Sequence, residues 1–166
     1  MKGTYAKMTM NKYVKDLVED YKIYTRSDLK VQETTGAPGK TLSKSGLEEP
    51  DKINNYRSFV GQLMWYTTKG GPDVANGAMY LAVHMSHPRA EHWKELGHFI
   101  GYLKGKETRV IIIINPKVLK VFMFCYLNYA TYKDTRKSVN VLVTTLGGTL
   151  LTCLSKTQST MTLRST

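Results

Sequence analysis

The segment that comes nearest to a known chemical motif is Gly36 to Thr41, which reads GAPGKT. Backbone amides of glycines, a lysine and a threonine are the groups that cradle the phosphates of a nucleotide. A phosphate-binding loop needs another glycine five residues before Gly39, where this chain has Thr34. It also follows an apolar strand, whereas residues 30–33 read KVQE. The sequence therefore predicts no nucleotide site in this segment.

Four histidines gather between residues 84 and 98, as they would in a metal site. No cysteine lies among them and none of them belongs to an HExxH pair, although zinc sites depend on such ligand types and spacings. Surface or helix-capping roles are expected instead. Nucleophilic catalysis is not indicated either, because no serine sits in a Gly-x-Ser-x-Gly turn. The histidines are His84, His87, His92 and His98.

Net charge gives the clearest indication of a partner. The chain has a formal charge of +11, and residues 101–166 contribute most of it, with 10 lysines and arginines against 2 acidic residues. A basic surface attracts nucleic acid through its phosphates, although basic side chains also serve solubility alone. The polar segment 132–138 supplies phosphate donors in Arg136, Lys137 and Ser138. The same segment reads equally well as a plain turn between strands.

Length and composition predict one globular domain or slightly more. With 166 residues, of which 42% are apolar and 22% charged, the chain can bury one sizeable core. No apolar run is long enough to cross a bilayer, and the first residues, MKGTYAKMTMNKY, do not resemble a secretion signal. Cys125 and Cys153 lie in apolar runs and are expected to be reduced. We therefore expect a cytoplasmic or nuclear protein with no membrane partner.

The first fifty residues predict a helix followed by a linker. Tyr13, Leu17 and Tyr21 recur at helical spacing within residues 9–22. Residues 33–52 are rich in glycine, proline, serine, threonine and charge, which predicts a linker or a long surface loop.

Residues 56–105 contain three further helical patterns. The first ends at Gly70-Gly71, while Pro72 and Pro88 suit the first turns of the second and third. Short connections predict that the three helices pack antiparallel. The predicted inward-facing residues are Tyr56, Phe59, Val60, Leu63, Met64 and Thr67 in the first helix, Ala75, Ala78, Met79, Ala82 and Met85 in the second, and Trp93, Leu96, Phe99, Ile100 and Leu103 in the third.

From residue 109 onward the pattern is that of strands. The segment 110–125 contains two apolar runs on either side of Asn115-Pro116, which predicts a hairpin. The segment 139–154 contains two more runs around Gly147-Gly148, which predicts another.

Several segments together resemble the end of copia-type retrotransposon polyproteins. The blocks YRSFVGQLMWYTTKGGPDVA at 56–75 and HMSHPRAEHWKELGHFIGYLKG at 84–105 are similar to the family's bridge between polymerase and RNase H. The segment 128–166 looks like the opening of its RNase H domain, with DTRKS, LGG and SKTQST in the family order. The resemblance implies an α+β fold, with a central helical block followed by a partial antiparallel RNase H-like sheet.

The same resemblance implies a division of the chain into three regions. Residues 1–52 would form an N-terminal helix and linker, residues 53–106 the helical connection region of a reverse transcriptase, and residues 107–166 a truncated RNase H-like β-region.

What the resemblance implies about activity is negative. RNase H chemistry needs four carboxylates that hold two divalent ions, and the first belongs to a pattern similar to FCDSNYA. Residues 124–130 read FCYLNYA, so Tyr126 stands at the aspartate position. A phenol keeps its proton near neutral pH and is a poor ligand for a hard cation. The next carboxylate would follow Ser165-Thr166, and the polymerase aspartates would precede Met1, so no catalytic residue, metal ligand or cofactor is predicted.

The leading prediction is an inactive remnant that binds RNA or an RNA–DNA hybrid weakly. Binding is expected to lack sequence preference, because phosphate contacts carry no base information. The residues expected to make the contacts are Lys104, Lys106, Arg109, Lys117, Lys120, Arg136, Lys137 and Lys156.

Two alternatives remain open. In the first, the chain is a domesticated interaction or scaffold module whose exposed sheet edge pairs with another protein or with a second copy. The apolar runs 110–114 and 121–125 favour it, because they would aggregate if left uncovered. In the second, a nuclease survives with ligands drawn from elsewhere, although Asp134 is the one carboxylate near the expected site in sequence.

Overall fold

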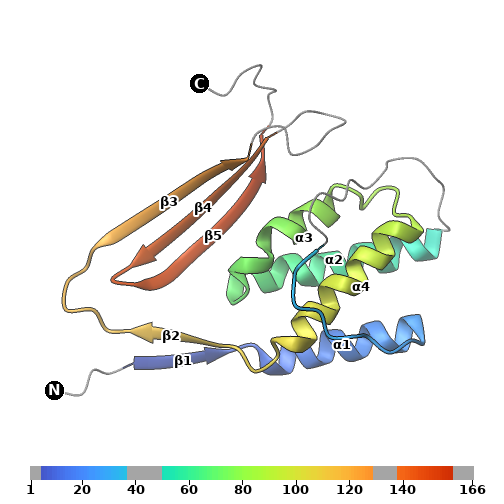
Figure 1. Ribbon diagram of the computed structural model, residues 1–166, viewed down its shortest axis with the longest axis horizontal. Coiled ribbons are helices and arrows are strands. Elements are labelled where there is room, and N and C mark those ends of the chain that lie inside the picture. The colour runs from blue at the N-terminus through green and yellow to red at the C-terminus, as the bar shows by residue number, and fades with distance from the viewer. Residues whose placement is uncertain (1–4, 37–49, 129–137, 159–166) are drawn as a thin grey trace. The chain divides into compact units, whose positions relative to one another are not determined.

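The computed structural model describes residues 5–36, 50–128 and 138–158. The helices are α1 (Asn11–Thr25), α2 (Pro50–Lys69), the short 3-10 helix η1 (Pro72–Val74), α3 (Ala75–Ala82) and α4 (Ala90–Gly105). The strands are β1 (Tyr5–Thr9), β2 (Val110–Ile114), β3 (Val121–Asn128), β4 (Val139–Leu146) and β5 (Thr149–Thr157). The α+β prediction is confirmed (Figure 1).

The chain divides into two compact units. The helical unit runs from Thr9 to Val110, and the strand unit comprises the described residues up to Met8 and from Ile111 onward. The three predicted regions 1–52, 53–106 and 107–166 stay a prediction, because that division names polyprotein regions rather than compact units.

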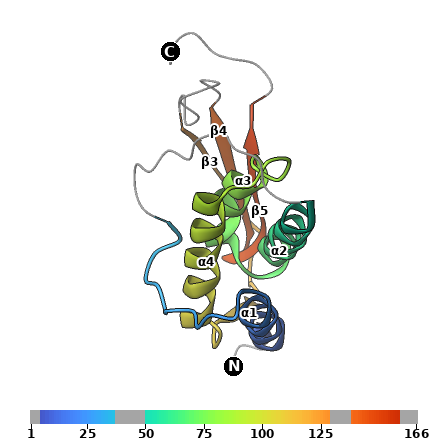
Figure 2. The same cartoon turned by 90° about the vertical axis from the view of Figure 1, so that its right-hand side faces the viewer.

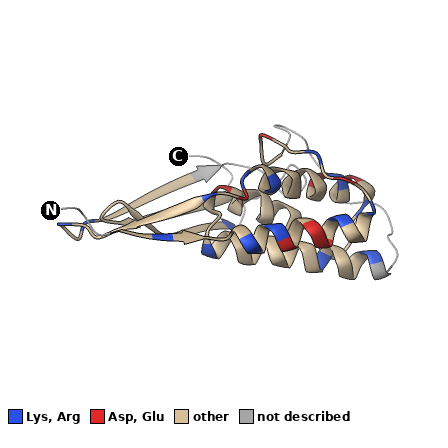
Figure 3. Cartoon of the chain, turned by 90° about the horizontal axis from the view of Figure 1, so that it is seen from below, with Lys and Arg blue, Asp and Glu red and all other residues tan. Residues whose placement is uncertain are grey.

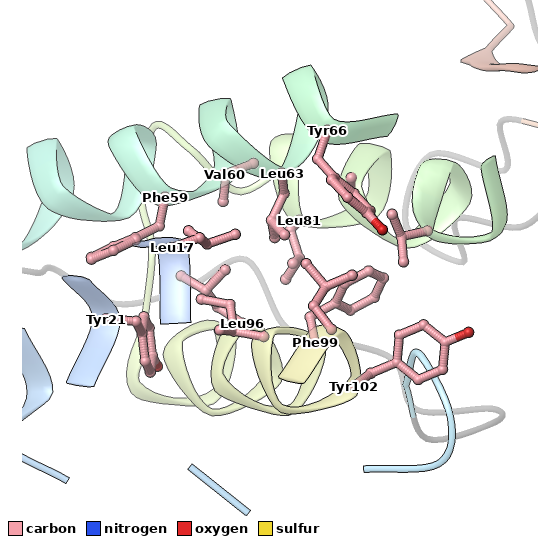
Figure 4. Packing of buried hydrophobic residues seen from close by; sticks show 14 of the residues in the cluster. Leu17, Tyr21, Phe59, Val60, Leu63, Tyr66, Leu81, Leu96, Phe99 and Tyr102 are labelled. Carbon is pink, nitrogen blue, oxygen red and sulfur yellow. The ribbon is translucent and has the colours of Figure 1, made fainter. Parts of the chain in front are cut away.

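The helical unit holds the hydrophobic core. Side chains of α2 and α4 meet between the two helices, where Leu63 and Leu96 are fully buried (Figure 4). The apolar spacing of the sequence explains this arrangement, since residues three and four apart share one face of a helix. Tyr21 from α1 closes the core with an edge contact to Phe59, at 5.1 Å between ring centroids. Figure 2 shows α1 and α2 close to end-on, beside α4. In the described ranges, no helix is long and apolar enough to span a bilayer.

The predicted linker over residues 33–52 is partly wrong. Helix α2 already begins at Pro50. Residues 29–36, here called the strap, pack along α4: Gln32 N donates a hydrogen bond to Gly101 O at 3.2 Å, and Leu29 is buried. The amino-acid composition could not predict the hydrogen bond to Gly101, because it joins backbone groups, which nearly every residue has. Residues 37–49 lie outside the described chain, and with them most of the GAPGKT segment.

A glycine on α4 makes the close approach of the strap possible. A Cβ atom at Gly101 would lie 2.4 Å from the carbonyl oxygen of Lys30, which is far inside van der Waals contact. The absence of a side chain therefore allows the backbone of the strap to lie directly on the helix.

The strand unit contains two sheets. Strands β1 and β2 form one, and β3, β4 and β5 form the other in that order. In the second sheet all neighbours are antiparallel, with Val121 opposite Leu146 and Val139 opposite Thr157. The predicted hairpin at 139–154 is confirmed. Its turn is Gly147-Gly148, at φ angles of +55° and +87°, which only glycine adopts without cost.

The predicted hairpin between residues 110–114 and 118–125 is wrong. Strand β2 pairs with β1, and β3 pairs with β4. The connection between β2 and β3 lies against the turn of the other hairpin: Gly147 N donates to Lys120 O at 2.8 Å, and Ile114 N donates to Thr149 Oγ1 at 3.1 Å. Asn115-Pro116 correctly marked a break between strands, but a break does not say which strand pairs with which.

Candidate nucleic-acid interface

Two of the predicted contact residues lie at the C-terminal end of helix α4 and already have partners inside the helical unit. Lys104 Nζ donates a hydrogen bond to Leu29 O at 2.8 Å, which ties the helix to the strap. Lys106 Nζ lies 5.9 Å from the centroid of the Tyr102 ring, within the range of a cation–π contact. A phosphate would have to compete with these contacts.

Arg109 also has a partner, because its guanidinium forms a bidentate ion pair with the carboxylate of Asp73. Its Nη2 atom donates to Asp73 Oδ2 at 2.9 Å, and its Nη1 atom contacts Oδ1. Tyr102 donates its hydroxyl proton to the same carboxylate at 2.5 Å. Burial alone raises the pKa of Asp73, but the hydrogen bonds from Arg109 and Tyr102 outweigh it, so that this pKa lies below its ordinary value. The carboxylate offsets the charge of Arg109, and we interpret the group as structural.

A surface groove between α1, α4 and the strap carries balanced charge. Its lysines are matched in number by carboxylates, which weakens its attraction for a polyanion. The charged residues that line it are Lys15, Lys22 and Lys104, with Asp16, Glu19 and Glu107.

The strand unit carries the less compensated positive charge. Lys117, Lys120 and Lys156 are exposed, Lys7 lies on β1, and the described residues of this unit include no Asp or Glu. Figure 3 accordingly shows its strands in tan with short blue segments. A nucleic-acid interface needs exposed positive charge that no carboxylate offsets. Of the predicted contact residues, Lys117, Lys120 and Lys156 therefore fit such an interface best.

The exposed lysines do not form one cluster. Lys120 directly precedes the Val121–Leu146 pair, whereas Lys156 lies opposite Asn140, six residues away along β4. At about 3.3 Å per residue, this places the two lysines roughly 20 Å apart along the sheet. Arg136 and Lys137 lie outside the described residues.

Tyr126, the residue at the expected aspartate position, lies on β3 opposite Val141. Its side chain is 66% exposed. Phe122 and Phe124 precede it by four and two residues, so the strand carries three exposed aromatic rings at alternate positions. Sequence reasoning treated the run 121–125 as an aggregation risk that favours pairing with another chain, and Tyr126 as a lost metal ligand. The signal that it missed was the alternation itself, since every second residue of a strand points to the same face.

Three of the four histidines, His84, His92 and His98, have side-chain partners inside the helical unit. His92 Nδ1 accepts a hydrogen bond from Arg89 N at 2.8 Å and so caps α4, which confirms a capping role. The surface prediction is wrong for His84, which is buried and stacks on His92 with 4.1 Å between ring centroids. His98 Nε2 donates to Thr34 O at 3.0 Å, and His87 is exposed. Across the described ranges, no group of three or more His, Cys, Asp or Glu side chains is arranged to hold a metal ion.

Comparisons with known proteins support the resemblance found in the sequence. A putative transposon Ty5-1 protein of Saccharomyces cerevisiae is 24% identical over 149 residues, which make up 90% of this chain and 47% of that protein. An uncharacterized mitochondrial protein of Arabidopsis thaliana is 29% identical over 124 residues, or 75% of this chain and 51% of that protein. This chain is a retrotransposon-derived protein.

A third relative of this retrotransposon-derived protein has a different description. The secreted RxLR effector protein 161 of Plasmopara viticola is 27% identical over 111 residues, or 67% of this chain and 78% of that protein. The chain spans about half the length of the yeast and Arabidopsis relatives, at 47% and 51%. No protein-family model and no solved structure matches it.

Proposed function

We propose that this retrotransposon-derived chain is a catalytically inactive remnant of a copia-type reverse transcriptase and RNase H polyprotein, and that its strand unit binds nucleic acid weakly and without sequence preference. The observation that carries the binding proposal is the charge of that unit. Lys7, Lys117, Lys120 and Lys156 face no acidic residue among its described residues. Uncompensated lysines gain free energy from phosphates by releasing counterions.

Tyr126 supports the proposed loss of catalysis. The resemblance to RNase H places the first metal-binding aspartate at this position of β3, and a protonated phenol does not replace a carboxylate as a ligand for Mg²⁺. The sequence predicted Arg109 as a phosphate contact. We leave it out of the proposed interface because both terminal nitrogens of its guanidinium already donate hydrogen bonds to Asp73.

Salt dependence tests the binding. We expect the affinity for a mixed-sequence RNA–DNA hybrid, measured by fluorescence anisotropy, to fall about 50-fold between roughly 50 and 200 mM salt if about three phosphates are neutralised. A variant in which Lys117, Lys120 and Lys156 are serines should lose most of this slope. The matched control replaces Lys12, Lys52 and Lys94 of the helical unit, which removes the same charge. Equal losses in the two variants, or binding that does not change with salt, would overturn the proposed interface.

Hydrolysis tests the loss of catalysis separately. The purified chain, incubated with a labelled RNA–DNA hybrid and Mg²⁺ or Mn²⁺, should leave the RNA strand intact. The Tyr126→Asp variant should do the same, because one restored carboxylate does not hold two ions. Cleavage by the unaltered chain that a chelator abolishes would refute the proposed inactivity.

The alternative function as an interaction module has one observation in its favour. Strand β3 is an edge of its sheet, and its segment Val121–Asn128 carries no charged side chain that would block pairing with another strand. A scaffold of this kind would elute as a discrete oligomer in size-exclusion chromatography with light scattering. A monomer of 18.8 kDa would refute self-association.

A further inference from the structure

Strand β3 presents a row of aromatic rings on one face of its sheet. Phe122, Phe124 and Tyr126 occupy alternate positions of an uninterrupted antiparallel pairing, so all three point to the same side. Their neighbours on β4 are small or medium residues, Thr145, Val143 and Val141. Successive rings are therefore about 6.8 Å apart along the strand and stand above lower side chains.

All three rings are open to solvent. The exposed fractions are 51% for Phe122, 60% for Phe124 and 66% for Tyr126. Aromatic rings on a sheet normally lie in a hydrophobic core, yet none of the β3 residues Val121–Tyr126, whose side chains the structure describes, belongs to the buried cluster. The rings thus leave their flat faces available to a partner that is itself flat and apolar.

Charge identifies the kind of partner. The described residues of the strand unit carry lysines and no carboxylates, and Lys120 lies two residues before the first ring. A second copy of the chain would bring a further set of lysines of the same sign, which opposes close contact. A single-stranded nucleic acid instead combines a negative backbone with bases that have flat faces and are not paired with another strand.

We propose that Phe122, Phe124 and Tyr126 form a platform on which bases of single-stranded RNA or DNA stack, while Lys117 and Lys120, which precede the strand, contact the phosphates. This inference rests on the proposed nucleic-acid binding and specifies the surface and the form of the ligand. Duplexes and hybrids keep their bases stacked on each other, so they contact only the lysines. In this arrangement, the position where RNase H has its first aspartate contributes the third ring.

The test compares one variant on each face of β3. The platform variant replaces Phe122, Phe124 and Tyr126 with valine, which keeps strand propensity and removes the aromatic faces. The control variant changes Val121 and Met123, which are both 62% exposed on the opposite face, to threonine. Affinities for an oligothymidylate of about 12 nucleotides, within the site sizes of stacking platforms, and for a duplex of similar length are measured with the full chain. Circular dichroism establishes that both variants fold.

We expect the platform variant to bind the oligothymidylate on the order of 100-fold more weakly, since stacking is lost at three bases. Its affinity for the duplex should stay unchanged, and the control variant should match the unaltered chain with both ligands. The single change Tyr126→Phe should retain full affinity for the oligothymidylate, because the ring is kept.

The possible failures are distinguishable. If the platform variant keeps its affinity for the oligothymidylate while the lysine variant loses it, the stacking platform is refuted and the proposed phosphate binding stands. If the unaltered chain binds neither ligand, the proposed function fails together with the platform. If light scattering shows a dimer that the platform variant dissociates, a second copy occupies the rings and the platform is refuted.

Discussion

At the scale of single residues, Asp73 is held from two directions, by the guanidinium of Arg109 and by the hydroxyl of Tyr102. These donors come from the end of α4 and from the residue before β2, so the carboxylate joins η1 to a segment 36 residues later. We expect Asp73→Asn to lower the free energy of unfolding by about 1–3 kcal/mol, because a half-buried arginine loses its charged partner. Urea denaturation at pH 7 measures the loss.

The loss of stability caused by Asp73→Asn should also depend on pH. Because the pKa of Asp73 is lower in the folded chain than its ordinary value, the carboxylate stabilises the fold above pH 4 and ceases to do so as the pH falls through the folded pKa. The difference between the unaltered chain and Asp73→Asn should therefore shrink below pH 4. As a control, Asp28→Asn removes the exposed partner of Lys22 and should change stability too little to measure. A difference that stayed constant down to pH 3 would show that Asp73 does not act through its charge.

At the scale of elements, two glycines inside helices should respond oppositely to alanine. Gly101→Ala would push a Cβ atom against Lys30 O, whereas a Cβ atom at Gly61 meets nothing within 4 Å. We expect Gly101→Ala to destabilise the protein by about 1–2 kcal/mol through displacement of the strap. Gly61→Ala should stabilise it by about 0.5–1 kcal/mol, because alanine has the higher helix propensity. Chemical denaturation monitored by circular dichroism decides both, and equal shifts would mean that the strap does not lie on α4 in solution.

Helices were predictable from the sequence because their signal is local. Phe59, Leu63 and Leu96 recur at helical spacing, and all three are buried as predicted. Met64 was predicted to face inward but is 37% exposed, since it lies at the margin of the apolar stripe beside Leu63. Strand pairing was less predictable. The partner of β2 is β1, about 100 residues earlier in the chain, and neither a turn nor an alternation records such a distant partner.

For the candidate interface, the sequence could predict which part of the chain is basic, but not which basic residues are free of partners or which face they share. Charge alone identified the basic last third, and three of its lysines are exposed in the strand unit. Charge alone could not reveal that Arg109 pairs with Asp73, because the two residues are distant in sequence and only the fold brings them together. The aromatic row depends on the register of β3 with β4, which fixes the common face and is not evident from the residue types.

At the scale of the whole molecule, the buried hydrophobic cluster of the described residues lies in the helical unit. Every member of the buried cluster lies between Val14 and Leu103. We therefore expect residues 9–110, expressed alone, to unfold cooperatively in urea and to retain their helical circular dichroism. The matched fragment, residues 111–166, lacks those buried residues and should show no cooperative transition. If the first fragment failed to unfold cooperatively, its core would require the strands.

The pairing of β1 with β2 also has a kinetic consequence. The two strands flank a segment of about 100 residues, and closing an unfolded loop of that length costs on the order of 4 kcal/mol in chain entropy. Two strands of five residues each offer too few hydrogen bonds to overcome this cost early in folding. Once α1 to α4 have packed, both ends of the segment are fixed and the cost has already been met. The sheet of β1 and β2 should therefore form after the helices, and its amides should exchange with solvent before those of α4.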